Sequence, residues 1–331
     1  MVQVFVTHNP EDLDAYYGRA LPKLREIADV VLNPTGRDLT TTELIEAAAG
    51  SDVIVAHRAT PGEAAVFDQM PDLLAFLRCA VDISTIDVGA ASAAGVLVGQ
   101  ADKSFVPSTS ELALALLMDT ARSVSVSTID FHNGMQPPQR PGRQLRGQTA
   151  GIIGYGAIGS YLAELLVAVG MEVLVTDPFV TVESEELKQV ELGELLAASD
   201  AVFPLAPAIP ETMHLIGRTA LAAMKPGATL INVSRGELLD EDAVAEALDS
   251  GHLGALGMDV GMAPDQRPSQ SLAERPGVVA TPHLGGLTPE NADAQAESSV
   301  DQIAAMLAGH MPPRTINPDD ATNLVAWWEH R

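Results

Sequence analysis

The sequence contains one cysteine, Cys79, among its 331 residues. A single cysteine cannot form an intramolecular disulfide, and zinc or iron–sulfur sites built on several thiolates are excluded. No apolar run reaches the ~20 residues that a bilayer-spanning helix requires. The N-terminal MVQVFVTHNP also lacks the basic segment and apolar core of a secretory signal. These absences predict a cytoplasmic protein with no membrane span and no metal site.

Basic residues are scarce as well. The chain has 19 Lys and Arg against 44 Asp and Glu, which gives a formal net charge of −25. Such a surface repels nucleic-acid phosphates and anionic lipids, so neither is an expected partner. It also repels small anions at long range, so a site for an acidic substrate must supply its own positive charge. Hydrophobic residues at 47% and charged residues at 19% are typical of a compact folded protein.

The first hundred residues alternate short apolar segments with amphipathic ones, which predicts a parallel α/β sheet. The predicted strands cover residues 2–7, 28–33, 51–58, 73–80 and 96–102. A capped helix is predicted over residues 40–50, and one long helix over residues 110–134 with Ser110 near its start.

A second α/β series follows the irregular, proline- and arginine-rich segment at residues 134–147, which predicts a connecting loop. Its strands are predicted at residues 149–156, 171–177, 201–206, 228–234, 254–260 and 278–283. Helices are predicted at 157–170 and 240–251. A chain of this length with two such series predicts two domains.

Glycines in the G-x-G-x-x-G arrangement follow the first strand of this second series, at Gly154, Gly156 and Gly159. The motif opens an apolar helix and leads to a strand that ends at Asp177, about 20 residues further on, as dinucleotide binding requires. Gly154 permits the tight turn, Gly156 lets the backbone approach a pyrophosphate, and Gly159 lets helix and strand pack closely. The free N–H groups and partial positive charge of the helix N-terminus favour phosphate.

Asp177 favours NAD over NADP, because a carboxylate binds ribose hydroxyls and repels a 2′-phosphate. The next residues, Pro178 and Phe179, supply no arginine for such a phosphate. The sequence therefore predicts NAD as the cofactor.

Three further stretches make a resemblance specific: LINVSRGELLDEDAVAEAL, GALGMDV and VVATPHLGG. Together with the glycine motif, they resemble the D-2-hydroxyacid dehydrogenase family, which contains phosphoglycerate dehydrogenase and glyoxylate/hydroxypyruvate reductase. The resemblance is strong over residues 110–290 and weaker over the first hundred.

The resemblance implies an α/β fold of two Rossmann-like domains with parallel sheets. Residues 1–99 and 288–331 would form a split substrate domain, and the NAD-binding domain at residues 100–287 would be inserted into it. The active site would lie in the cleft between them, and the protein would be a symmetric homodimer acting on a small-molecule acid.

The resemblance also implies catalytic roles. Arg235 would anchor the substrate carboxylate, which suits a permanently charged guanidinium that can form two parallel hydrogen bonds. His283 would exchange the proton of the 2-hydroxyl, which suits an imidazole that titrates near neutrality. Asp259 would hold the carboxamide side of the nicotinamide. The implied cofactor contacts further include Ala157, Ile158, Pro207, Thr212, Val233, Ser234, Arg235, His283, Gly285 and Gly286.

One departure concerns the acid that pairs with the histidine. The family pattern is D-V-F-x-x-E-P, in which the glutamate raises the pKa of the histidine. Here Pro264 stands at the glutamate position and Asp265 follows it. Either Asp265 replaces the glutamate as a catalytic acid, or the partner is missing and His283 stays nearer its ordinary pKa of ~6.5.

A second departure lies in the expected substrate loop. The family pattern resembles R-x-G-V-G-V-D-N-I-D, whose glycine N–H groups receive the substrate carboxylate. This chain keeps Arg78 but has Ala80, Val81 and Asp82 in the loop, so both glycines are replaced. An aspartate facing a carboxylate is repulsive unless its side chain points away or binds hydroxyls of another substrate.

Three functions are therefore considered. The first is an NAD-dependent oxidoreductase acting on a small 2-hydroxy or 2-keto acid. The second is an NAD-dependent enzyme of the same scaffold with altered chemistry or substrate. The third is a non-enzymatic NAD(H) sensor, against which Arg235 and His283 argue, since neither is needed merely to hold NAD.

Overall fold

The computed structural model describes residues 1–263 and 265–331. The chain forms two compact units: unit 1 is Met1–Ser104 with Pro289–Arg331, and unit 2 is Phe105–Thr288. Residues 100–104, which were expected in the second domain, belong to unit 1. The Gln100 N–H donates to the Arg314 carbonyl and the Ala101 N–H to the Ala80 carbonyl, which holds this segment to unit 1.

Unit 1 contains a five-stranded parallel sheet of order β2-β1-β3-β4-β5. This is the flavodoxin-like order of doubly wound sheets. The strands are β1 (Gln3–Val6), β2 (Asp29–Leu32), β3 (Val53–Ala56), β4 (Ala75–Arg78) and β5 (Leu97–Gly99), all within predicted segments.

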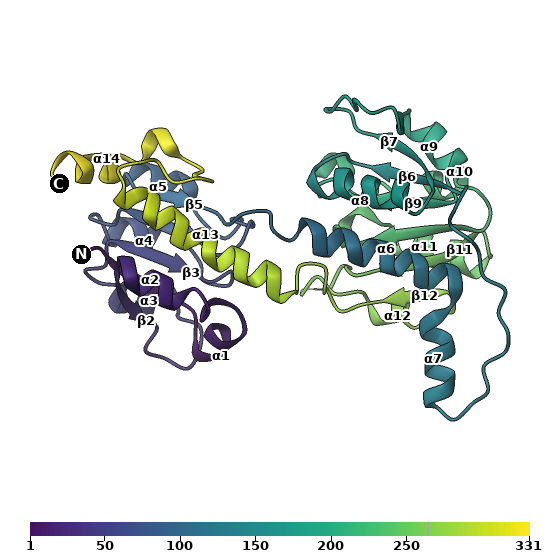
Figure 1. The fold of residues 1–331 in the computed structure, drawn as a ribbon, viewed down its shortest axis with the longest axis horizontal. Coiled ribbons are helices and arrows are strands. Elements are labelled where there is room, and N and C mark those ends of the chain that lie inside the picture. Colours follow the sequence, from purple (N-terminus) through teal and green to yellow (C-terminus); the bar gives the residue numbers. More distant parts are fainter. Residues whose placement is uncertain (264) are drawn as a thin grey trace. The chain divides into compact units, whose positions relative to one another are not determined.

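Helices cover both faces of this sheet (Figure 1), so the alternate residues of each buried strand face two different cores. One core lies against α2 (Leu21–Ile27), α13 (Pro289–Leu307) and α14 (Thr322–Glu329). The other lies against α3 (Thr41–Ala47), α4 (Ala64–Gln69) and α5 (Val88–Ala93). The short α1 (Pro10–Asp12) continues into a π-helical turn over Leu13–Tyr17.

Unit 2 contains a seven-stranded parallel sheet of order β12-β11-β10-β9-β6-β7-β8, the dinucleotide-binding order with an added edge strand. Its strands are β6 (Thr149–Ile153), β7 (Glu172–Thr176), β8 (Leu187–Gln189), β9 (Ala201–Pro204), β10 (Ala228–Asn232), β11 (Leu253–Met258) and β12 (Val278–Ala280). The sequence predicted all of them except β8, whose three half-buried or exposed residues carry no apolar pattern. Both sheets thus confirm the predicted α/β class.

The helices of unit 2 also lie on two faces. One core packs against α6 (Val106–Arg122) and α8 (Ala157–Ala168). The other packs against α9 (Leu192–Ala198), α10 (Arg218–Ala223), α11 (Glu241–Asp249) and α12 (Gln270–Ala273).

The predicted single helix over residues 110–134 is wrong in two respects. It begins at Val106, where Pro107 stands in the first turn, and buried Ser110 lies inside it. It then breaks at Ser123, which has a left-handed φ of 54°, and α7 (Val124–His132) follows. The Asp119 carboxylate accepts from the N–H and hydroxyl of Ser125, so it caps the second helix and stabilises the break.

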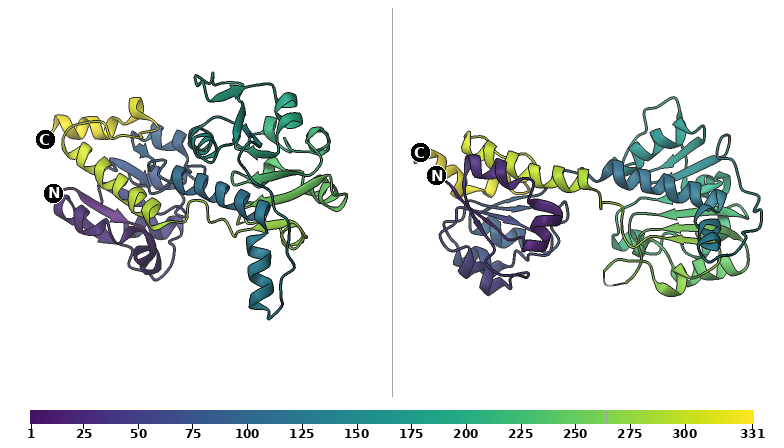
Figure 2. Two further views of the ribbon diagram at one scale, coloured as in Figure 1. Left: turned by 45° about the vertical axis from the view of Figure 1, so that its right-hand side comes forward. Right: turned by 60° about the horizontal axis from the view of Figure 1, so that its bottom comes forward.

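Helix α7 has no buried residue, and Figure 2 shows it projecting from the sheet of unit 2. Among the described residues, no single helix is long and apolar enough to span a membrane. Within the described residues, α6 and α7 are the only pair that together have the length and composition of a membrane span, and they meet at a 69° bend.

Candidate functional site

The glycine turn of unit 2 follows β6 and has a distinct geometry at each of its three glycines. Gly154 has φ +101°, and a Cβ there would lie 2.9 Å from the backbone of Leu205 and Ala206. A Cβ at Gly159 would lie 2.2 Å from the Gly154 carbonyl oxygen, whereas one at Gly156 would meet nothing within 4 Å. The turn is therefore closed by its first and third glycines and open at the second, as a pyrophosphate site requires.

Asp177 directly follows β7 and contacts the same turn. Its carboxylate accepts the Tyr155 N–H at 2.7 Å, and also the N–H groups of Phe179 at 2.8 Å and Val180 at 3.1 Å. The predicted ribose-binding acid thus lies beside the glycine turn. Helix α8 begins at Ala157, and Ile158 follows, with its carbonyl accepting from the Ser110 hydroxyl at 3.3 Å. The preceding Gly156 has no side chain to cap this N-terminus, so the first N–H groups can face a phosphate.

The loop after β9 contains Pro207 and Thr212, which belong to one turn. The Thr212 hydroxyl donates to the Pro207 carbonyl at 2.6 Å. The loop after β10 contacts the loop after β9, because the Ser234 hydroxyl donates to the Ala206 carbonyl at 3.2 Å. Val233 is 5% exposed, so its side chain is buried in the core of unit 2.

Arg235 follows β10, and its loop is held by the fully buried Asn232. The Asn232 amide donates to the Arg235 carbonyl at 2.8 Å and accepts the Ser234 N–H at 3.1 Å. Asn232 was not among the residues predicted from the sequence. A polar residue at the end of an otherwise apolar strand was the available signal.

His283 follows β12 in a turn that contacts Asp259, the residue after β11. The Asp259 carboxylate is fully buried and accepts from the Thr281 hydroxyl, the Leu284 N–H and the Gly285 N–H, at 2.5, 2.7 and 2.8 Å. Thr281, like Asn232, was not predicted from the sequence to contribute to this region. Gly286 and half-buried His283 lie in the same segment.

Asp265 binds a neighbouring arginine. Its carboxylate lies 3.1 Å from Arg267 Nε and accepts the Arg267 N–H at 3.2 Å, and 56% of the Asp265 side chain is exposed. Within the described residues, 1–263 and 265–331, no contact joins Asp265 to His283. Pro264, which stands at the expected glutamate position, lies outside these residues.

The residues predicted to bind substrate begin at Arg78, the last residue of β4 in unit 1. Arg78 is 1% exposed, and its guanidinium donates to the carbonyls of His57 and Thr60 and to the Thr85 hydroxyl. Burial lowers the pKa of Arg78 to about 10. This arginine therefore joins three loop positions inside unit 1.

Ala80, Val81 and Asp82 continue from Arg78 at the surface of unit 1. Ala80 and Val81 are half-buried, and Asp82 is exposed. Asp82 Oδ1 accepts the Ser84 N–H at 2.9 Å, so this carboxylate is engaged within its own loop.

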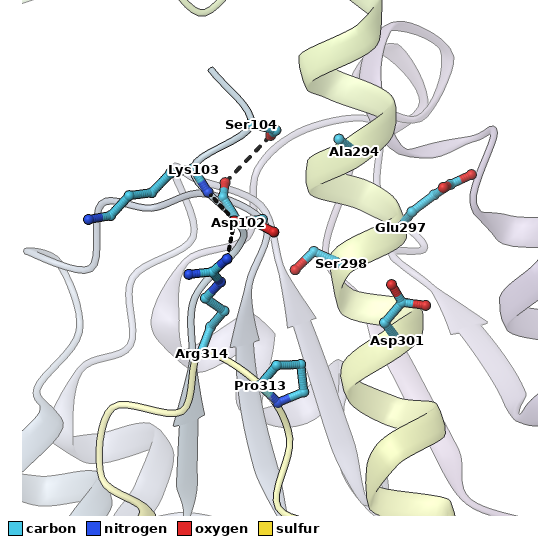
Figure 3. Close-up of a pocket in the computed structure, with 9 residues that line it drawn as sticks. All are labelled: Asp102, Lys103, Ser104, Ala294, Glu297, Ser298, Asp301, Pro313 and Arg314. Atoms are coloured by element: carbon cyan, nitrogen blue, oxygen red, sulfur yellow. Dashed lines mark hydrogen bonds and ion pairs between the residues drawn. The ribbon is translucent and has the colours of Figure 1, made fainter. Parts of the chain in front are cut away.

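A cavity of about 620 Å³ lies elsewhere in unit 1 and contains none of the predicted site residues. Figure 3 shows it beside α13, with the Arg314–Asp102 ion pair on one side and Ser298 and Asp301 on the helix. The predicted residues of unit 2 instead follow the carboxyl ends of β6, β7, β9, β10, β11 and β12. In open parallel sheets, ligands bind at this edge.

Comparisons with known proteins match most of unit 2 to one family. The family described as "D-isomer specific 2-hydroxyacid dehydrogenase, NAD binding domain" matches residues 114–285. The D-3-phosphoglycerate dehydrogenase of Mycobacterium leprae is 35% identical over 282 residues, which are 84% of this chain and 53% of that protein. The chain thus spans about half the length of this relative.

Two other matches cover nearly all of both proteins. The glyoxylate reductase of Thermococcus gammatolerans is 30% identical over 319 residues, which are 91% of this chain and 95% of that protein. The crystal structure of the TT0316 protein from Thermus thermophilus superimposes with a TM-score of 0.83 at 32% identity and covers 95% of this chain and 100% of that one. The similarity therefore extends over both units.

Proposed function

We propose that this chain is an NAD-dependent oxidoreductase, because it belongs to the D-isomer specific 2-hydroxyacid dehydrogenase family. Its residues 114–285 match the NAD-binding domain of that family. NAD, when bound, would supply or accept a hydride, and the substrate is a small 2-hydroxy or 2-keto acid. Two relatives carry the names glyoxylate reductase and hydroxypyruvate reductase, which supports this substrate class.

One observation carries the proposal. The glycine turn, the Arg235 loop and the His283 turn all follow carboxyl ends of strands in one parallel sheet. The open position at Gly156 and the acid at Asp177 suit a dinucleotide without a 2′-phosphate. A sheet edge that held NAD alone would need neither the arginine nor the histidine.

The proposed chemistry assigns one task to each of these two side chains. The Arg235 guanidinium binds the substrate carboxylate and thereby orients the carbon that gains or loses hydride. The His283 imidazole donates a proton to the carbonyl oxygen during reduction and accepts it from the hydroxyl during oxidation. Within unit 1, Arg78 joins the loop positions of His57, Thr60 and Thr85.

The test is NADH consumption with glyoxylate, hydroxypyruvate, pyruvate and phenylpyruvate, with NADPH in parallel. We expect turnover that prefers NADH. His283→Ala should lose at least about a hundredfold in kcat, the lower range for general acid–base catalysis, and still bind NADH. Turnover that survives this substitution would refute the assigned role of His283.

A second candidate is the same scaffold acting on a different substrate or by different chemistry. The Asp265–Arg267 pair favours considering it, because that carboxylate is engaged by an arginine. Saturable NADH binding without turnover of any of the four ketoacids would favour this candidate over the first.

We also propose that a second copy of this chain covers α7 and forms a homodimer. Val124, Ile129 and Phe131 on this helix are 57%, 56% and 59% exposed, and Met135 after it is 51% exposed. Large apolar side chains exposed together on one helix favour an interface between proteins. Sedimentation should give twice the chain mass of 34.7 kDa, and Ile129→Asp should give one chain mass at the same concentration. A wild-type monomer would refute the dimer.

A further inference from the structure

The carboxylate of Asp259 is an unusual feature of unit 2, because it is completely buried and bound entirely by one short turn. Asp259 continues β11, and its N–H donates to the Asn232 carbonyl at 2.9 Å. Its side chain crosses to the neighbouring segment, where one hydroxyl and two backbone N–H groups donate to it. These three donors satisfy the buried charge, which would otherwise be very costly.

The turn that donates these bonds contains His283 in a backbone conformation that side chains rarely adopt. His283 has φ +62°, and its N–H donates to the Thr281 carbonyl at 3.0 Å. Consecutive residues with a left-handed member direct successive N–H groups into one concave site that binds an anion. Here the N–H groups of Leu284 and Gly285 follow the left-handed residue, and the Asp259 carboxylate is the anion.

The turn is also confined from its other side. A Cβ at Gly285 would lie 3.1 Å from Asp259 Oδ2 and 3.3 Å from the side chain of Thr109, which belongs to α6. The turn is therefore packed between the carboxylate and a core helix. If the carboxylate were lost, the left-handed conformation of His283 would lose the bonds that compensate its strain.

We propose that Asp259 is a positioning residue for proton transfer. It fixes the Thr281–Gly285 backbone and thereby sets the direction in which the His283 imidazole points. The inference rests on the proposed acid–base role of His283 and differs from the cofactor contact that the family resemblance implies for Asp259. A carboxylate that is 0% exposed and bound by three protein donors acts on the reaction through the turn it holds.

Two substitutions test this role in the full-length protein. Asp259→Asn keeps the shape of the side chain but replaces one acceptor oxygen with an NH₂ group, which cannot accept the Gly285 N–H. Thr281→Val removes one donor and leaves the carboxylate in place. We expect kcat to fall roughly 10- to 100-fold in the first variant, as for other misplaced catalytic groups, and by less in the second.

In both variants the NADH dissociation constant should stay within about twofold of wild type, because only the turn is altered. Amide hydrogen exchange at Leu284 and Gly285 should become faster. The matched control is Asp200→Asn. Asp200 directly precedes β9, so it lies at the amino ends of the strands of the same sheet, away from Asp259. Asp200 accepts the Thr149 N–H at 2.9 Å and pairs with Lys225 at 3.0 Å, so its loss should affect stability and leave kcat unchanged.

Two outcomes would overturn the inference. One is a raised NADH dissociation constant in Asp259→Asn with normal kcat at saturating NADH, which would assign Asp259 to the cofactor. The other is unchanged amide exchange at Leu284 and Gly285 in both variants. Failure of the proposed function gives a different result: His283→Ala would keep its turnover, and the exchange measurement would still decide whether Asp259 holds the turn.

Discussion

Gly156→Ala is the substitution that best separates cofactor binding from folding. Gly156 has φ −82° and ψ −161°, an extended conformation that alanine adopts without strain. A methyl group there meets nothing within 4 Å in the protein. If a pyrophosphate lies against this backbone, however, the methyl group occupies the space that the phosphate needs.

The expected change in folding stability is close to zero because two effects cancel. Alanine is a poorer residue than glycine at the start of α8, at a cost of about 0.5–1 kcal/mol. Alanine also restricts the unfolded chain, which stabilises the protein by about 0.4–1 kcal/mol. The NADH dissociation constant should rise roughly tenfold or more, and each factor of ten corresponds to about 1.4 kcal/mol.

The assay is a fluorescence titration with NADH, together with urea unfolding of the same sample. Gly159→Ala is the matched comparison, since its methyl group would lie 2.2 Å from the Gly154 carbonyl oxygen. That overpacking should cost about 1–3 kcal/mol of stability in addition to affinity. If Gly156→Ala binds NADH as tightly as wild type, a pyrophosphate does not pack against this glycine.

Other predictions concern buried polar groups. Burial lowers the pKa of His8 to about 3, so the folded state resists a proton that the unfolded state accepts below ~6.5. The contribution of neutral His8 to the free energy of unfolding is complete above pH ~6.5 and decreases as the pH falls toward 3, with about 2 kcal/mol lost by pH 5. His8→Phe should remove that part of the pH dependence of urea unfolding, and an unchanged profile would contradict the burial effect. Asn232→Ala frees the Arg235 loop, so steady-state kinetics should show a higher ketoacid KM with a smaller change in kcat; a normal KM would argue against this support. Arg78→Met leaves buried carbonyls without donors, so urea unfolding should show a loss of about 2–4 kcal/mol, and wild-type stability would mean that these bonds contribute little.

The glycine motif could be predicted residue by residue because each role depends on local backbone geometry. A tight turn, an open backbone and a close helix–strand contact each exclude a side chain for a different reason. The strands were predicted for a similar reason, since parallel strands buried on both faces are short continuous apolar runs. β8 is the exception, with no buried residue to mark it.

The break between α6 and α7 could not be predicted from helix propensity or apolar content, which continue through Ser123. It depends on a side chain four residues earlier, because the Asp119 carboxylate offers the next helix a cap. Serine and aspartate compete with helix hydrogen bonds only when the chain can place them at a terminus.

Arg78 and Asp259 show what a motif can and cannot predict about a charged residue. The motifs placed both at carboxyl ends of strands, where a ligand-binding role is a reasonable expectation. The structure gives both charges protein partners: Arg78 donates to two carbonyls and a hydroxyl, and Asp259 accepts from one turn. A buried charge must be satisfied where it stands, and once protein groups satisfy it, it acts on a ligand through the loops it holds. For Asp259 that loop contains His283, so the buried carboxylate acts on the proposed proton transfer by holding the turn that orients this histidine.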